Sequence, residues 1–256
     1  MASLASNALD HAHTHLAEQG YCIIEGVLTA SQIREMREAL YRIARFDRSH
    51  GWVNNYNYDE SASETLRLWN LISRDPIFCE LVEHDLALEF VRELIGWPAL
   101  LSSTSANIVS ADDGELIIHA DQTYMPEPWA RPHCVNIAWC IDEFRLENGA
   151  TLVMPRSHHH NRSWQEADGE EGLVPLEGPP GSMAVLDGRL WHSTGRNRTG
   201  RPRAGIFNSY TLPIYLPQEN WFRSLNPAIQ QFGSETMLTL LGFRPGLLGR
   251  INGLQG

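Results

Sequence analysis

Hydrophobic and polar positions follow a helical period in the first hundred residues and a strand-like period after them. Ile33, Met36, Leu40 and Ile43 recur three or four positions apart, which predicts an amphipathic helix with Thr29 as its N-cap. Flanking Gly and Pro residues delimit further helices. These are expected over 7–19 and over 75–96, the second with a possible restart at residue 85.

From residue 99 onward the pattern favours strands. Short apolar runs separated by turn residues predict strands over 100–109, 115–120, 132–142, 151–154, 183–187, 189–194 and 202–210. An earlier strand over 21–28 and a last helix over 227–241 complete the pattern. Helices before and after a block of strands indicate an α+β protein, mainly β, in which helices buttress a β core.

One domain over 1–256 is therefore expected, because 256 residues suit a single β-rich core. Its parts would be a helical buttress over roughly 1–98, a β core over roughly 99–215 and a C-terminal helix over 216–256.

His119, Asp121 and His192 form a candidate metal site. Residues two apart in a strand point the same way, so His119 and Asp121 can face one ion together. Two imidazoles and one carboxylate can hold a divalent metal on one face and leave the opposite face open. That arrangement is typical of non-haem Fe(II) oxygenases.

Arg203 supplies a candidate anchor for an organic acid beside that metal. His192 and Arg203 fall on two extended runs, and residues 195–200 between them have the composition of a turn. A hairpin at this turn would place Arg203 beside His192 across a β-ladder.

Several longer motifs surround these residues. They are His119-Ala120-Asp121-Gln122, the 147–151 segment leading to Pro155-Arg156-Ser157-His158, the 187–192 segment, Arg203 and the N-terminal 20–28 segment. With these motifs the chain resembles the phytanoyl-CoA dioxygenase family of Fe(II)/2-oxoglutarate oxygenases over nearly its whole length. One departure is Arg156, where the family usually has Gly.

The resemblance implies a fold and a cofactor set. The fold would be a double-stranded β-helix, a cupin-like jelly-roll of two facing sheets with helices outside. His119, Asp121 and His192 would be the catalytic ligands of Fe(II), and Arg203 would bind the distal carboxylate of the cosubstrate 2-oxoglutarate.

The resemblance also implies a reaction. 2-Oxoglutarate and O2 would take the open metal positions, with release of succinate and CO2. A small organic substrate would be hydroxylated, desaturated or cyclised, in natural-product or secondary metabolism. Halogenation is disfavoured, because Asp121 occupies the position that a halide would need.

Other residues are candidates for the pocket. Thr151 and Asn107 are candidates for hydrogen bonds to 2-oxoglutarate. The candidates for substrate contacts are Arg67, Asn70, Gln122, Tyr124 and Trp129. Trp129 could instead cover the core, and Arg67 could form a surface ion pair. His158, His159 and His160 are expected to be solvated, and His133 to be structural.

Composition narrows the possible partners. The net charge of −11 argues against nucleic acid, because phosphate binding needs a basic surface. No apolar run is long enough for a membrane span, and the first eighteen residues lack signal-peptide features. The four cysteines form no Cys-x-x-Cys pair, which favours reduced thiols in a cytoplasmic protein. The expected partner is a small-molecule substrate, and the chain is expected to be a monomer or homodimer.

Two other functions remain open from the sequence. One is a cupin-like metal-dependent hydrolase or isomerase without 2-oxoglutarate, and the other is a non-catalytic jelly-roll binding protein. Arg203 argues against the first, since a hydrolase has no use for a cationic keto-acid anchor. The complete set of metal ligands argues against the second.

Overall fold

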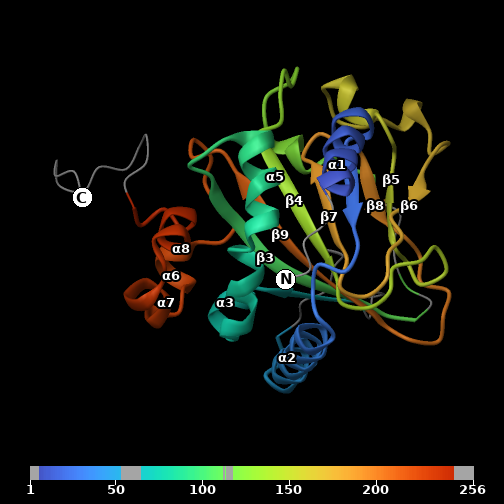
Figure 1. Ribbon diagram of the computed structural model, residues 1–256. Coiled ribbons are helices and arrows are strands. Elements are labelled where there is room, and N and C mark those ends of the chain that lie inside the picture. Colours follow the sequence, from blue (N-terminus) through green and yellow to red (C-terminus); the bar gives the residue numbers. More distant parts are fainter. Residues whose placement is uncertain (1–5, 53–64, 112, 114–117, 245–256) are drawn as a thin grey trace.

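The computed structural model describes residues 6–52, 65–111, 113 and 118–244. Six strands form one antiparallel sheet in the order β1-β7-β4-β9-β3-β2 (Figure 1). In chain order these strands are β1 (Tyr21–Ile24), β2 (Leu66–Trp69), β3 (Leu100–Val109), β4 (Cys134–Cys140), β7 (Met183–Asp187) and β9 (Arg203–Thr211).

A second sheet of three strands has the order β6-β5-β8. Its strands are β5 (Thr151–Val153), β6 (Val174–Pro175) and β8 (His192–Thr194). Val153 and Leu176 from this side join one apolar cluster with Ala138 and Ala184 of the large sheet, so the two sheets face each other. The predicted jelly-roll core of two facing sheets is confirmed, and its strands pair antiparallel.

Helices cover the other face of the large sheet (Figure 1). In this helix layer α5 packs on β4 and β7, α3 on β3, and α1 on β1 and β7. The layer's helices are α1 (Ser6–Gln19), α2 (Ala30–Ser49), α3 (Leu71–Arg74), α4 (Cys79–Val82) and α5 (Asp85–Ile95). The C-terminal helices are α6 (Trp221–Ser224), α7 (Pro227–Phe232) and α8 (Glu235–Leu240). The 3-10 helices are η1 (Pro76–Phe78), η2 (Asp121–Tyr124), η3 (Ser157–His160) and η4 (Glu166–Asp168).

Alternation along β9 shows how one strand serves both faces. Ile206 is fully buried in the apolar cluster under the helices, and the Tyr210 hydroxyl donates to the Val82 carbonyl at 2.8 Å. Phe207 instead packs in the cluster between the two sheets. Arg203 shares that inner side, where its guanidinium lies over the Phe144 ring. Even-numbered residues of β9 therefore face the helices, and odd-numbered residues face the interior between the sheets.

Local signals set the helix boundaries. Thr29 caps α2 as predicted, in a reciprocal pair of hydrogen bonds with Gln32. The helix predicted over 75–96 is broken into η1, α4 and α5, and α5 restarts at Asp85 and ends at Gly96. Within the described ranges, no helix combines the length and the apolar character that crossing a membrane requires.

Three details of the predicted elements need correction, and a fourth prediction is not tested. The single C-terminal helix is wrong, because Ser234 caps a separate helix, α8, after α7 ends at Gly233. The region predicted as a helical buttress supplies not only the expected strand β1 but also β2 to the large sheet. The strand predicted over 115–120 lies mostly outside the described residues. The hairpin joining His192 to Arg203 is wrong too, because β8 pairs with β5 whereas β9 pairs with β3 and β4. The connection thus crosses from one sheet to the other.

Candidate metal centre

Main-chain pairing brings the two distant ligand segments together. The His119 N–H donates to the His192 carbonyl at 2.9 Å, and the His192 N–H donates to the His119 carbonyl at 2.8 Å. Ala120 is extended, so His119 and Asp121 still project together although Asp121 begins η2 rather than continuing a strand. The three predicted ligands therefore lie close together at the edge of the space between the two sheets.

The three side chains present their ligand atoms to a common point. Asp121 Oδ1 lies 3.9 Å from His119 Nε2 and 3.8 Å from His192 Nε2. All three ligand atoms lie within 4.8 Å of one another. Two ligand atoms of one ion, with bonds of about 2.1 Å, can be at most about 4.2 Å apart, so one ion can bridge Asp121 to either imidazole.

Hydrogen bonds leave the correct atoms available for a metal. His192 Nδ1 lies 3.0 Å from the Leu190 carbonyl, which can only accept. Nδ1 therefore carries the proton, and the Nε2 lone pair faces Asp121. The Asn136 amide donates to Asp121 Oδ2 at 3.0 Å, which leaves Oδ1 directed at the imidazoles. This donor set fits a divalent transition metal.

Electrostatics favour the charged form of Asp121. Desolvation by burial raises its pKa. The two imidazoles, the Asn136 hydrogen bond and the Arg67 charge together lower the pKa by more than burial raises it, so the pKa lies below the ordinary Asp value. The Asp121 side chain is 22% exposed and that of His119 is 37% exposed. The large sheet, through Asn136, thus supports the ligand side chains on one side, and solvent reaches them on the other side.

Arg203 lies at the closed end of the interior. It is 2% exposed, its Nη2 donates to the Gly149 carbonyl, and its guanidinium carbon lies 4.1 Å from the Phe144 ring centroid. Gly149 has a φ of +79°, and a Cβ there would meet the Gly195 carbonyl oxygen at 2.6 Å. The Gly in the 147–151 motif therefore lets this loop pack against the backbone of residues 195–197, in the position where the Gly149 carbonyl accepts from Arg203.

Thr151 and Asn107 both face the interior. Thr151 pairs with Thr194 on the face of the small sheet that carries His192. Asn107 pairs with Gly205, two residues along β9 from Arg203. The Asn107 Oδ1 atom is buried and has no hydrogen-bond partner among the described residues. Because this oxygen only accepts, a ligand carboxylate in the interior would be bound by the Asn107 NH2 group and not by Oδ1.

The five predicted substrate residues have different surroundings. Arg67 lies on β2 with its guanidinium 4.3 Å from the Trp69 ring centroid, on the side that faces Asp121. The Asn70 amide donates to the Ser224 carbonyl at 2.8 Å, away from the ligands. Tyr124 is 85% exposed and Trp129 is fully buried, with its indole donating to the Met125 carbonyl. Their substrate roles stay predictions.

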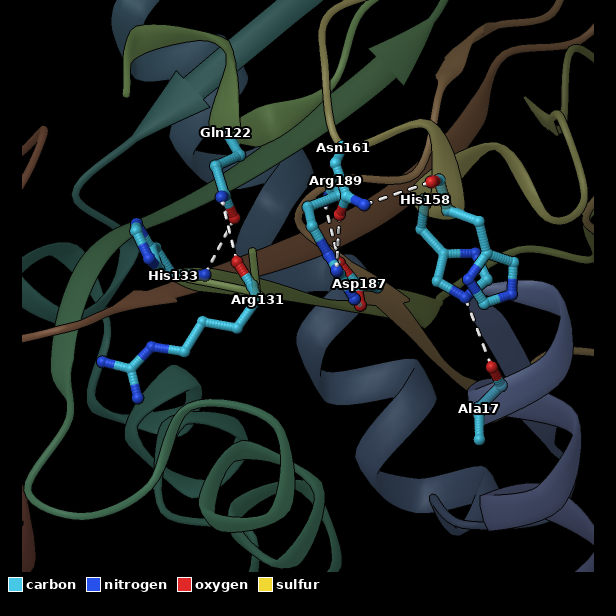
Figure 2. A network of polar contacts seen from close by, with 9 residues as sticks. Ala17, Gln122, Arg131, His133, His158, Asn161, Asp187 and Arg189 are labelled. Carbon is cyan, nitrogen blue, oxygen red and sulfur yellow. Dashed lines mark hydrogen bonds and ion pairs between the residues drawn. The ribbon is translucent and has the colours of Figure 1, made fainter. Parts of the chain in front are cut away.

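Gln122 ties the metal-ligand turn to the next loop. Its side-chain amide donates to the Arg131 carbonyl at 3.2 Å and accepts from the His133 N–H at 2.8 Å (Figure 2). Its backbone N–H donates to the Gly188 carbonyl at 2.8 Å. The Gln122 side chain thus fixes the turn that begins with Asp121.

Asp187 and His158 support neighbouring segments (Figure 2). Asp187 pairs with Arg189, whose other nitrogen donates to Asn161 at 3.0 Å. His158 was expected to be solvated, and this is wrong: it is 2% exposed and lies 3.3 Å from the Ala17 carbonyl. The packing of α1 against η3 buries it. His133 is structural as expected, since its Nδ1 lies 2.9 Å from the Tyr215 hydroxyl.

Two residues near the site were missed from the sequence. Asn136 orients Asp121, and Phe144 lies under Arg203. Asn136 leaves a signal, because it is the one amide in the otherwise apolar Cys134–Cys140 run. Phe144 leaves none, because its partner is distant in the chain.

Known proteins similar to this chain share both sequence and fold. Residues 16–205 match the family described as phytanoyl-CoA dioxygenase (PhyH). "Dioxygenase af480" of Aspergillus fumigatus is 30% identical over 237 residues, covering 91% of this chain and 76% of the relative. "Multifunctional dioxygenase prhA" of Penicillium brasilianum is 26% identical, covering 94% of this chain and 84% of the relative.

Solved structures share the fold at lower identity. HygX from Streptomyces hygroscopicus, solved with nickel and 2-oxoglutarate, has a TM-score of 0.66 at 18% identity, covering 84% of this chain and 90% of its own. EctD from S. alaskensis, solved with 2-oxoglutarate and 5-hydroxyectoine, has a TM-score of 0.67 at 18% identity, covering 86% and 83%. With the sequence match over residues 16–205, these findings place the chain in the phytanoyl-CoA dioxygenase family.

Proposed function

We propose that the protein is an Fe(II)/2-oxoglutarate-dependent dioxygenase that hydroxylates, desaturates or cyclises a small organic molecule. The observation that carries this proposal is the convergence of His119 Nε2, Asp121 Oδ1 and His192 Nε2 on one point. The fixed proton on His192 Nδ1 and the Asn136 hydrogen bond support it, because both leave the metal-facing atoms unprotonated.

The protein's own residues would bind and orient the cosubstrate. Arg203 would form a charge-assisted pair with the distal carboxylate of 2-oxoglutarate. Asn107 and Thr151, on facing sheets, would donate to its oxygens nearer the metal. When bound, iron with 2-oxoglutarate and O2 supplies the oxidation, and succinate and CO2 are the expected products. The buried surroundings of Arg203 would exclude water from that end.

Similar proteins support a role in natural-product metabolism. HygX has been solved with hygromycin B, and the epimerase SnoN with nogalamycin RO. SnoN is described as an epimerase from nogalamycin biosynthesis. We infer a substrate of comparable kind for this chain, oxidised in a biosynthetic or secondary pathway.

An anaerobic absorption experiment tests the proposal. Fe(II) and 2-oxoglutarate added together should produce a weak visible charge-transfer band in the wild-type protein. The Asp121→Ala variant should lack the band, and Asp168→Asn, which changes a carboxylate of the η4 loop, should keep it. Metal binding without a band would favour a hydrolase or isomerase that uses no 2-oxoglutarate, and no metal binding would favour a binding module.

A further inference from the structure

Two adjoining hollows lie along α2, the helix drawn lowest in Figure 1. The first, here named the polar hollow, has a volume of about 430 Å³ and is lined by Arg37, Glu38, Tyr41, Arg42 and Arg45. The second, the apolar hollow, has a volume of about 300 Å³, and its lining includes Ala44, Leu66, Ile108 and Pro202. Tyr41 and Arg45 line both hollows, so the two form one groove with a polar part and an apolar part.

The groove lies on the outer face of the large sheet, away from the metal ligands. Ile108 of the apolar hollow pairs with Ala204, and both belong to the apolar cluster under the helices. Arg203 precedes Ala204 in β9 and points to the opposite face, because side chains alternate along a strand. The sheet therefore separates a ligand in the groove from a ligand at Arg203 and the metal centre.

Core residues form the floor of the apolar hollow. Ala44 is 5% exposed and Ile108 is 4% exposed, and Leu66 is partly exposed beside them. The volume of this hollow is at the lower end of the range for small-molecule sites. An apolar chain placed over Ala44 and Ile108 would be removed from water on that side, and this favours binding.

Two arginines at the groove are available to a ligand. Arg45 lines both hollows, Arg48 lines the apolar hollow, and both side chains are exposed. In the part of the chain that the structure describes, neither guanidinium has a hydrogen-bond or ion-pair partner. Residues three apart in a helix have Cβ atoms about 5–6 Å apart, so one carboxylate can contact both arginines.

Neighbouring charges limit the charge of the ligand. The other two arginines of the polar hollow are already paired, Arg37 with Asp142 and Arg42 with Asp75. Glu38 adds a further negative charge to the lining. A ligand with a single negative charge therefore fits better than a doubly charged phosphate, which Glu38 would repel more strongly.

We propose that this groove is a second binding site and that it takes an amphipathic carboxylate, such as a medium-chain fatty acid. The carboxylate contacts Arg45 and Arg48, and the apolar chain lies in the apolar hollow over Ala44 and Ile108. The site is independent of the proposed function, because its ligand touches neither the metal ligands nor Arg203.

Ligand-observed NMR on the full-length protein tests the proposal. Ni(II) and excess 2-oxoglutarate are present, so that the metal centre and Arg203 are occupied. The probes are octanoate, octan-1-ol, protonated octylamine and acetate. Octanoate should bind at least about tenfold more tightly than acetate, because acetate has no chain to bury, and at least about threefold more tightly than the other two. Equal binding of octan-1-ol or octylamine, or equal binding of acetate, would overturn the proposal.

Substitutions on α2 locate the binding. Arg45→Gln combined with Arg48→Gln should weaken octanoate by about tenfold or more, because the carboxylate loses both charged partners. Arg34→Gln, at an exposed arginine of the same helix outside both hollows, is the matched control and should stay within about twofold. Ala44→Leu fills part of the apolar hollow and should also weaken octanoate. If Ala44→Leu does not fold, as judged by circular dichroism, the arginine variant decides, and wild-type binding of octanoate by it refutes the assignment.

Two further measurements separate the groove from the metal centre. Octanoate affinity should be the same with and without Ni(II) and 2-oxoglutarate, and displacement of octanoate by 2-oxoglutarate would refute the assignment to the groove. The anaerobic band should form unchanged in the Arg45→Gln and Arg48→Gln variant. Absence of the band in wild type would refute the oxygenase proposal and leave the groove site standing.

Discussion

The two faces of the large sheet differ in what they contribute. The outer face is mainly apolar and covered by helices, with Leu68, Ile137, Val185 and Ile206 almost fully buried, and the polar pair Thr104 and Asn208 is buried there as well. The inner face carries arginine, asparagine and serine side chains, several of them partly exposed beside the metal ligands. Because side chains alternate along each strand, the same sheet supplies both faces. Stability and chemistry can thus be changed separately by substitutions one residue apart.

The difference also explains why the inner face can hold buried polar atoms. Burying a polar group without a partner costs free energy, as for the Asn107 Oδ1 atom. Apolar burial on the outer face, worth about 25 cal/mol per Å², offsets that cost. The following predictions test this division, from the largest expected effect to the smallest.

The inner-face change with the largest expected effect is Arg203→Ala. It should weaken 2-oxoglutarate binding by roughly 3–5 kcal/mol, because the distal carboxylate would lose its buried partner. The 2-oxoglutarate dependence of the anaerobic band measures this. Arg201→Ala, at an exposed arginine two residues away, is the control and should behave like wild type. An unchanged affinity in Arg203→Ala would show that the anchor lies elsewhere.

On the outer face, Ile206→Ala should lower the free energy of unfolding by about 2–5 kcal/mol, because it leaves a cavity in the packed layer under the helices. Ni(II) affinity should not change. Phe207→Ala, at the next residue on the opposite face, should lose less stability because Phe207 is already partly exposed. Urea unfolding of both variants measures the contrast, and equal losses would contradict the division into two faces.

Asn136→Ala should weaken metal binding by about 10- to 100-fold, because Asp121 loses the hydrogen bond that orients it. Ile137→Val, on the other face of β4, should keep the wild-type metal affinity. Calorimetric titration with Ni(II) measures both. Wild-type affinity in Asn136→Ala would make this amide a structural residue only.

The smallest effect is expected at a partly exposed ion pair outside the large sheet. Arg162 lowers the pKa of Asp168 to about 2. This pair therefore stabilises the fold at pH values above the ordinary Asp pKa, and the contribution is lost as pH falls toward 2. Asp168→Asn should cost less than about 1 kcal/mol at neutral pH, because the pair is solvated. The difference from wild type in urea unfolding should shrink between pH 5 and pH 3, and a constant difference would refute the pairing.

The sequence predicts the ligands better than their arrangement. His119, Asp121 and His192 are visible because their residue types and flanking motifs are local in the chain. The strand Leu100–Val109 is also predicted with its observed bounds. Strand pairing is non-local, so the sheet change between His192 and Arg203 could not be read from the turn residues that connect them.

Supporting contacts are the least predictable part of the site. Asn136 reaches Asp121 from fifteen positions away in the chain, and Arg203 reaches Gly149 across fifty-four. Each depends on the final packing of two sheets. Burial of His158 likewise depends on where α1 packs, which its polar neighbours do not indicate.

The most direct test of the account is a crystal structure grown without oxygen in the presence of Fe(II) and 2-oxoglutarate. The account predicts one metal ion bonded to His119 Nε2, Asp121 Oδ1 and His192 Nε2, with the far carboxylate of 2-oxoglutarate on the Arg203 guanidinium. A metal bound without one of these three ligands, or a 2-oxoglutarate carboxylate held away from Arg203, would contradict it.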